Sequence, residues 1–313
     1  PVCLTAHMDH PGFVTDRMTG KRRVRAFWRG GVPREYFVGS GVRFFTAEHG
    51  WVRGRVRSVR TVKRLGQLRV DTASIDVERP VESGTIGMWD FPDPRVRGRR
   101  IYARACDDLA GAAAMLCALD ELVRRDHACE VYFLFTRAEE VGFIGAMAAA
   151  RRKTIPPRCL VVAMETSSER VHARIGDGPI LRVGDRASVF TPAVTAYCHR
   201  VARELAAVDR SFTFQRKLMD GGTCESSAYC ALGYDATGLC LALGNYHNVD
   251  RTRNRLGPEY IDLLDFHNVV KWFVELARAP HPYRGRDADL DRQLAELRKT
   301  YAPLLRASRR KPR

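Results

Sequence analysis

The chain has 313 residues, of which 45% are hydrophobic and 28% charged, a balance that predicts a folded protein with room for two domains. No run of 18 apolar residues argues for a membrane-spanning helix, and nine scattered cysteines without a C-x-x-C pair favour a reducing cytoplasm over a disulfide framework. The net charge of +16 is concentrated in residues 11–100, but no zinc finger or other nucleic-acid-binding motif accompanies it, so we interpret it as solvated strand faces and expect no nucleic-acid partner.

The first predicted strand, residues 2–9, ends in His7-Met8-Asp9 and is broken by His10-Pro11-Gly12. Little scaffold precedes this end, so we expect the natural protein to continue upstream. Residues 13–98 then change character, because short alternating segments are separated by Gly and Pro. This pattern predicts a small β-barrel or sandwich inserted into another domain. Its expected strands are residues 22–28, 35–38, 42–46, 51–59 and 68–77.

From residue 99 onward, predicted strands alternate with predicted helices. Strands are expected at residues 131–135, 160–164, 180–182, 212–218 and 236–243, and helices at residues 107–125, 142–152, 192–207, 226–232 and 260–277. This alternation predicts an α/β domain with a mainly parallel, mixed sheet and helices on both faces. Residues 1–12 and 99–285 would form that discontinuous domain, with residues 13–98 inserted into it.

A further helix is predicted for residues 286–306, within a C-terminal unit of residues 286–313. Its apolar side chains fall on one side, which makes it amphipathic: Leu290, Leu294, Leu297, Tyr301, Leu304 and Leu305. The basic tail, residues 309–313, is interpreted as a solvated end and not as a localisation signal.

Two adjacent carboxylates, Glu139 and Glu140, follow the predicted strand at residues 131–135. Adjacent side chains on extended backbone point to opposite sides, so one carboxylate can bind a metal while its neighbour faces a water. That division suits metal-assisted hydrolysis. Further candidate ligands lie at or near other predicted strand ends, where the sites of open α/β sheets gather: His7, Asp107, Glu165 and His247.

Catalytic zinc sites use histidine nitrogen and carboxylate oxygen and leave one position open for water. Two ions about 3.5–4 Å apart can share one carboxylate and one water. Such a site needs a bridging carboxylate, one further carboxylate and one histidine for each ion, and a free base. The six candidates supply this set, which makes their combination far more specific than any single motif.

Taken together, the motifs resemble those of the glutamyl aminopeptidase/TET family of co-catalytic dinuclear zinc metallopeptidases. The long gap between His7 and Asp107 also matches, because related enzymes without the inserted β-domain have a much shorter one. The matching pieces follow the family's order: Ala6-His7-Met8-Asp9, Cys106-Asp107-Asp108-Leu109-Ala110-Gly111, Glu139-Glu140-Val141-Gly142, Glu165-Thr166, Gly221-Gly222-Thr223 and Tyr246-His247.

The resemblance implies two divalent ions per chain, zinc or cobalt. His7 and Glu165 would bind one ion. Glu140 and His247 would bind the other. Asp107 would bridge the two.

The resemblance also implies roles for residues beside the metal ligands. Asp9 would orient the His7 ring, and Glu139 would be the general base that moves a proton from water to the leaving amine. A cis peptide bond is expected between Asp107 and Asp108. Substrate contacts would come from two short segments: Asp177, Gly178, Gly222 and Thr223.

Three departures from the family pattern lie around the substrate. Glu165 stands where Asp is commoner, Cys224-Glu225 follows the Gly-Gly-Thr motif where Asp is usual, and Tyr246-His247-Asn248 differs from the commonest ending. They leave the residue preference open.

We therefore predict a cytoplasmic, metal-dependent aminopeptidase that acts on peptides. By analogy with the family, it would form a homo-oligomer, a dimer or larger, through the inserted domain, which would also control substrate access. One alternative is a related zinc carboxypeptidase or N-acyl-amino-acid deacylase that grips the other end of its substrate. Another is a non-catalytic basic binding module that uses residues 13–98 and carries a dead metal site.

Overall fold

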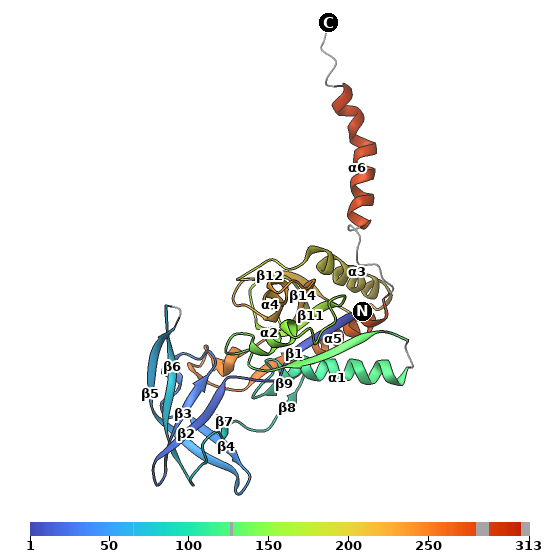
Figure 1. The fold of residues 1–313 in the computed structure, drawn as a ribbon. Helices are drawn as coiled ribbons and strands as arrows, with labels where there is room; N and C mark the ends of the chain where they lie inside the picture. Colours follow the sequence, from blue (N-terminus) through green and yellow to red (C-terminus); the bar gives the residue numbers. More distant parts are fainter. Residues whose placement is uncertain (65, 126–127, 280–287, 308–313) are drawn as a thin grey trace.

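The computed structural model describes residues 1–64, 66–125, 128–279 and 288–307. Figure 1 shows three parts: an α/β body, a β-barrel beside it, and a long C-terminal helix that stands away from both. Within the described ranges, no helix is long and apolar enough to span a lipid bilayer.

The body is built on a sheet of six strands. In spatial order they are β10 (Val131–Thr136), β1 (Val2–His7), β11 (Leu160–Ser168), β14 (Ala236–Leu243), β12 (Ile180–Asp185) and β13 (Gln215–Met219). Neighbouring strands run parallel, except that β12 and β14 are antiparallel. The predicted mixed, mainly parallel sheet is therefore confirmed.

Helices cover both faces of this sheet, as predicted. One face carries α1 (Leu109–Arg124), α3 (Pro192–Val208) and α5 (Leu263–Arg278), and the other carries α2 (Ile144–Arg151) and α4 (Glu225–Ala231). Successive side chains of one strand enter different cores: Val162 packs under the first set of helices and Val161 under the second. Both sides of the strand are thus buried, which explains its continuous apolar run.

The inserted segment closes into a six-stranded barrel with the order β2-β3-β6-β5-β4-β7. Its strands are β2 (Gly12–Gly20), β3 (Arg23–Arg29), β4 (Gly41–Thr46), β5 (Gly50–Arg64), β6 (Gln67–Val77) and β7 (Ile86–Trp89). Along β3, Val24, Ala26 and Trp28 are buried inside the barrel, whereas Arg23 is exposed and Arg25 half-buried. This alternation puts arginines on the solvent side of the barrel wall.

Among the predicted elements that differ from the structure, two have a clear local cause. Residues 35–38 do not form a strand, because Pro33, with φ of −61°, leads into a short 3-10 helix, η1 (Arg34–Tyr36). The last helix of the body starts later than expected, because β17 (Glu259–Asp262) precedes α5. Asp262 ends that strand and caps α5 by accepting hydrogen bonds from the N–H groups of Leu264 and Asp265.

Short elements complete the edge of the body. β17 pairs with β9 (Arg100–Ala103), which pairs with β8 (Arg95–Arg97). The turn η2 (Tyr246–Asn248) follows β14 and leads into a small hairpin of β15 (Val249–Asp250) and β16 (Arg255–Leu256). Val249 packs into the hydrophobic core of the barrel, so this hairpin joins the two regions.

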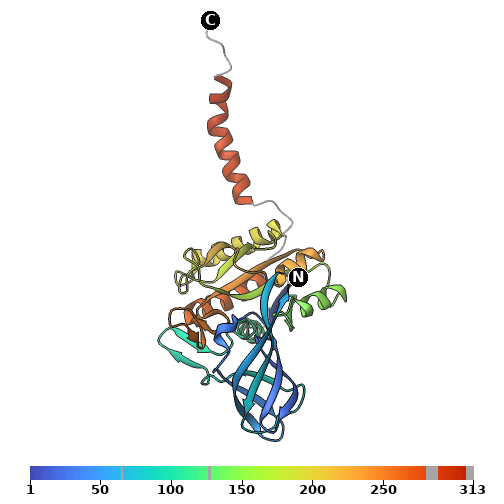
Figure 2. The same ribbon diagram turned by 90° about the vertical axis from the view of Figure 1, so that its left-hand side faces the viewer.

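The C-terminal helix α6 (Ala288–Ala307) forms over the predicted amphipathic segment and projects away from the body in both views (Figures 1 and 2). Its side chains Leu290, Leu294, Leu297, Tyr301 and Leu304 are 45% to 63% exposed. The Leu305 side chain and the basic tail, residues 309–313, lie outside the described part of the chain.

Candidate metal centre

The fold brings the predicted ligands to one edge of the sheet. β1, β10, β11 and β14 run parallel, so their carboxyl ends share that edge, where binding sites of α/β sheets form. The residues gathered there are His7 at the end of β1, Glu139 and Glu140 after β10, Glu165 in the second half of β11, His247 in η2, and Asp107 just before α1.

The side chains form two groups that share Asp107. In the first group, His7 Nε2 lies 3.2 Å from Asp107 Oδ1 and 3.4 Å from Glu165 Oε1. In the second, His247 Nε2 lies 3.3 Å from Glu140 Oε2 and 3.7 Å from Asp107 Oδ2. The two oxygens of one carboxylate therefore face two different histidine–carboxylate pairs.

The donor set fits divalent cations. Glu140 Oε1 and Asp108 Oδ2 are buried without a hydrogen-bond partner. Among the described residues, no lysine or arginine forms an ion pair with the carboxylates of the two groups. Buried carboxylates without a nearby cation are costly, and histidine nitrogen with carboxylate oxygen is a donor set that zinc prefers.

Burial and charge shift the pKa values of these groups. Burial, together with the charge of Glu165, raises the pKa of Asp107 to about 7. Burial alone would lower the pKa of His247, but the adjacent Glu140 carboxylate outweighs it and raises that pKa to about 10. His247 is therefore protonated near neutral pH when no cation is bound, and Asp107 is partly protonated. Metal binding must displace these protons, so metal affinity should increase with pH.

Both histidines are oriented by backbone carbonyls. His7 Nδ1 donates to the carbonyl of Asp9 at 3.0 Å, and His247 Nδ1 donates to the carbonyl of Gly31 at 2.8 Å. Each ring thereby presents Nε2 to the carboxylates. Gly31 follows β3 and belongs to the inserted region, so the barrel segment supplies one of the two orienting contacts.

Asp9 also supports the site through its side-chain carboxylate. Its carboxylate accepts hydrogen bonds from the N–H groups of Glu139 and Glu140, at 3.0 and 3.2 Å, and its Oδ1 lies 3.7 Å from His7 Nδ1. The ring itself is held by the Asp9 carbonyl. The carboxylate therefore mainly fixes the loop that carries the two glutamates.

The two glutamates do not lie on extended backbone, because the chain turns at Ala138, which has a φ of 62°. Their carboxyl groups nevertheless have separate environments. The Glu140 carboxylate contacts His247, whereas the Glu139 carboxyl makes no hydrogen bond within the described ranges. Burial, followed by the charge of Glu165, raises the pKa of Glu139 well above its usual value.

Three supporting residues hold the backbone around Asp107, a role that was not predicted for any of them. Glu259 Oε2 accepts the N–H groups of Cys106 and Asp107, at 2.8 and 3.0 Å. Thr166 Oγ1 donates to the Cys106 carbonyl, and His10 Nδ1 donates to the Asp107 carbonyl at 2.7 Å. The expected cis peptide bond joins Asp107 to Asp108.

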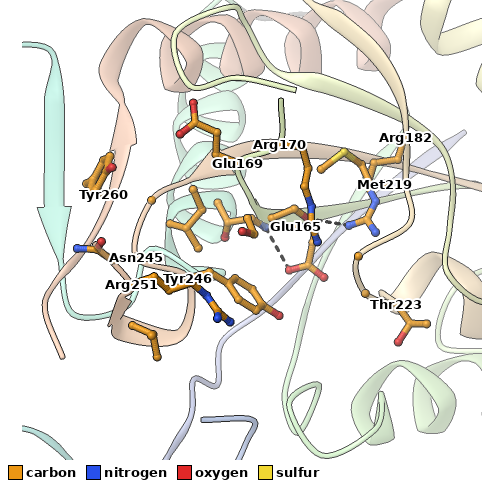
Figure 3. Close-up of a pocket in the computed structure, with 18 of the residues that line it drawn as sticks. Glu165, Glu169, Arg170, Arg182, Met219, Thr223, Asn245, Tyr246, Arg251 and Tyr260 are labelled. Carbon is orange, nitrogen blue, oxygen red and sulfur yellow. Dashed lines mark hydrogen bonds between the residues drawn. The ribbon is translucent and has the colours of Figure 1, made fainter. Parts of the chain in front are cut away.

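A pocket of about 460 Å³ opens beside the first group, and Glu165 contributes to its wall (Figure 3). Arg170, Arg182 and Arg251 also line it. Within the described ranges, none of the three forms an ion pair with a carboxylate. A pocket with three unpaired guanidinium groups beside a metal-binding cluster suits a substrate with an anionic group.

Two of the three arginines are held in different ways. Arg182 is 2% exposed; its Nη1 donates to the Ser167 hydroxyl at 3.0 Å, while its buried Nε has no partner. Arg170 is exposed, and its guanidinium lies over Gly221, where a Cβ atom would stand 1.6 Å from Nη2. A side chain at position 221 would therefore displace Arg170.

The structure separates the predicted substrate residues. Gly222 and Thr223 line the arginine pocket. Asp177 instead borders two shallower hollows away from it, and Gly178 is buried, with the space for a Cβ filled by the Thr213 carbonyl at 2.3 Å. Asp265 ties this second segment to α5 by accepting the N–H groups of Gly176 and Gly178.

The parallel-rich sheet with a closed barrel beside it is similar to the fold of solved TET aminopeptidases. The TET1 peptidase of Pyrococcus horikoshii, which assembles into a tetrahedron or a large octahedral shell, is 20% identical, with a TM-score of 0.72 over 89% of this chain and 84% of that one. The TET aminopeptidase of a marine-sediment Thaumarchaeota archaeon is 19% identical, with a TM-score of 0.72 over 89% of this chain and 80% of that one.

The sequence comparisons identify the family. The model of the M42 glutamyl aminopeptidase family matches residues 1–253, so this chain belongs to that family and the resemblance seen in its motifs is confirmed. A protein of Acetivibrio thermocellus described as an aminopeptidase is 26% identical over 286 residues, which cover 88% of this chain and 81% of that protein. A lysyl aminopeptidase of Pyrococcus furiosus is 25% identical over 65% of this chain and 62% of that protein.

Proposed function

We propose that this protein is an aminopeptidase that works with two divalent metal ions, zinc or cobalt. His7 and Glu165 would hold one ion, Glu140 and His247 the other, and Asp107 both. The single observation that supports this best is the shared carboxylate: Asp107 Oδ1 and Oδ2 face His7 and His247, at 3.2 and 3.7 Å. When bound, such ions polarise the scissile carbonyl and increase the acidity of water.

We further propose Glu139 as the general base. It stands in the cluster without a hydrogen-bond partner for its carboxyl in the described ranges, while its neighbour Glu140 contacts a histidine. Burial raises the pKa of the Glu139 carboxyl, which makes its carboxylate form a stronger proton acceptor. Glu139 would take a proton from the attacking water and deliver it to the leaving amine. Asp9 would position it through the backbone of the 139–140 loop.

Metal removal and substrate choice test this function together. A chelator should abolish hydrolysis of peptides with a free amino terminus, and Zn²⁺ or Co²⁺ should restore it, with two ions per chain by elemental analysis. Peptides with a blocked amino terminus should remain intact. Activity that survives chelation would contradict the metal requirement. Cleavage of N-acyl substrates would favour the deacylase, and cleavage of carboxyl-terminal residues would favour the carboxypeptidase. An inactive protein that binds no metal would favour the non-catalytic binding module.

We propose that the preferred amino-terminal residue is acidic. The pocket beside Glu165 presents Arg170, Arg182 and Arg251, and the family is named for glutamyl aminopeptidase activity. A carboxylate side chain could pair with these guanidinium groups, whereas a lysine side chain would be repelled. A preference like that of the lysyl relative from Pyrococcus furiosus is therefore not expected.

The acidic preference is tested with glutamyl, leucyl and lysyl substrates that share one leaving group. Arg170→Gln should lower kcat/KM for the glutamyl substrate by about 10–100-fold, because one charged hydrogen bond contributes about 1.5–3 kcal/mol, and should leave the leucyl substrate nearly unchanged. Arg174→Gln, an exposed change outside the pocket, is the matched control. Equal losses for all three substrates would contradict a role in selectivity.

We also propose a cytoplasmic, homo-oligomeric enzyme. All nine cysteines are free thiols, which suits a reducing compartment. Assembly into large shells is known for the Pyrococcus horikoshii peptidase of the same fold. Sedimentation of the purified protein would test the oligomer, and fractionation of the source cells would test the location.

A further inference from the structure

The apolar face of α6 has a regular spacing. Its members alternate at steps of four and three residues, the spacing of a coiled-coil seam in which apolar residues occupy positions a and d: Leu290, Leu294, Leu297, Tyr301 and Leu304. All five are 45% to 63% exposed in a helix that stands apart from the body in both views (Figures 1 and 2). An exposed row of this regularity is a helix-pairing surface.

We propose that α6 pairs with α6 of a second copy of this chain, in antiparallel orientation. With this pairing, Leu294 faces Leu297 of the partner and Leu290 faces Tyr301 of the partner. Two-fold symmetry repeats both contacts, which gives four apolar layers from two identical helices. This contact would involve α6 alone and no surface of the body or the barrel.

Charge on the flanks selects this arrangement. Asp291 and Arg298 both occupy position e, and in an antiparallel pair position e of one helix faces position e of the other. In the register above, Asp291 faces Arg298 of the partner, twice in the pair. Sliding the helices by one heptad would instead bring Asp291 to Asp291 or Arg298 to Arg298, which is repulsive. Within the described part of the chain, neither Asp291 nor Arg298 forms an ion pair with a residue of the same chain.

Pro303 supports the same orientation. A proline inside a helix lacks an N–H group and tends to kink it. In the antiparallel register, the last apolar layer is the one that contains Tyr301, so Pro303 lies beyond the apolar seam. A parallel pair would have to keep the seam regular through Pro303 as far as Leu304, and it would place the uncharged Gln293 opposite Arg298.

Cross-linking tests the contact directly in the full-length protein. Tyr301→p-benzoylphenylalanine places a photoreactive aromatic group in the seam. Irradiation should join two chains, and mass spectrometry should find the link near Leu290 of the partner. A link near position 301 of the partner would overturn the antiparallel arrangement. A link to the body or within one chain, or the absence of any link, would overturn the pairing.

Matched substitutions test the energetics by sedimentation equilibrium. The double variant Leu294→Glu with Leu297→Glu should weaken association by about tenfold or more, because charges replace apolar side chains at two seam positions of each helix. Ala295→Glu with Ala302→Glu makes the same change of charge off the seam and should leave association unchanged. Metal content and thermal unfolding of the body should stay the same in both variants. Equal association of the two variants would refute the seam.

Charge reversal tests the register. Asp291→Arg alone and Arg298→Asp alone should each weaken association, because each creates two like-charge contacts. The double variant should restore it, since the opposite charges face each other again. Failure of the double variant to recover would overturn the proposed register. This experiment does not depend on catalysis, so it remains informative whatever reaction the metal centre performs.

Discussion

Aromatic rings fill the interior of the barrel, whereas carboxylates gather at the edge of the body. Phe13, Trp28, Phe37 and Trp89 are buried together, with centroid distances of 4.7 to 6.2 Å for the contacts that Phe13 makes with the other three. At the sheet edge, Asp107 and Glu165 are equally buried, but their neighbours include further carboxylates. The barrel interior is stabilised by contacts that the chain itself provides. The proposed metal centre would be complete only with cations.

Burial therefore has opposite consequences for stability in the two regions. Removing aromatic surface from water stabilises the barrel whether or not metal ions are present. Burying charge destabilises the body unless a ligand compensates, and a bound ion then adds stability that depends on its free concentration. The two regions should therefore respond differently to chelators.

The largest expected effect is on turnover. Glu139→Gln should lower kcat by about 10²–10⁴-fold, because it removes a proton acceptor and leaves the proposed metal ligands in place. Metal content, measured by elemental analysis, should be unchanged. A variant that loses both metal and activity would show that Glu139 is a ligand and not the base.

The next effect tests the barrel. Phe13→Ala should lower the free energy of unfolding by about 3–5 kcal/mol, because it empties the centre of the aromatic cluster. Denaturant titration with tryptophan fluorescence measures it, since Trp28, Trp51 and Trp89 all lie in the barrel. Phe45→Ala, at a ring that is 58% exposed, is the matched control and should cost far less. The loss should be the same with and without chelator. A loss of unfolding free energy that appears only with metal bound would contradict the proposed difference between the barrel and the metal centre.

The third effect separates the two adjacent glutamates. Glu140→Gln should weaken binding of one of the two ions by about 100-fold, because it removes a charged oxygen that faces His247. Competition with a coloured chelator measures the affinity, and the rise in melting temperature on adding Zn²⁺ should shrink. If Glu139→Gln and Glu140→Gln changed metal affinity equally, the division between base and ligand would be wrong.

The smallest effect concerns a helix cap in the body, away from the cluster. Asp262→Ala should lower the free energy of unfolding by about 1 kcal/mol, since it removes the acceptor for the N–H groups of Leu264 and Asp265. Asp262→Asn keeps that acceptor and should recover most of the loss in a melting experiment. An alanine variant as stable as the wild type would show that water replaces the cap.

The fold class and the residues of the candidate cluster could be predicted from the sequence for a physical reason. Buried parallel strands are apolar throughout, so the polar residue that follows one, such as His7 after β1, stands out. Glu259 was missed because its strand was read as the first turn of the long helix, although Asp262 carries the signature of a helix cap. Gly31 could not be found at all. It contacts a histidine 216 positions away through its backbone carbonyl. Every residue type has such a carbonyl, so the sequence does not reveal which one makes the contact.

That carbonyl contact has a thermodynamic consequence. The hydrogen bond from His247 Nδ1 to Gly31 is shared between a proposed metal ligand and the barrel segment. Any event that changes the position of the barrel segment, such as association through the barrel, changes the energy of orienting the ring. Reciprocity then requires that metal binding change that event by the same factor. Metal loading and subunit association would thus be coupled equilibria, with a coupling free energy that a titration at several protein concentrations could measure.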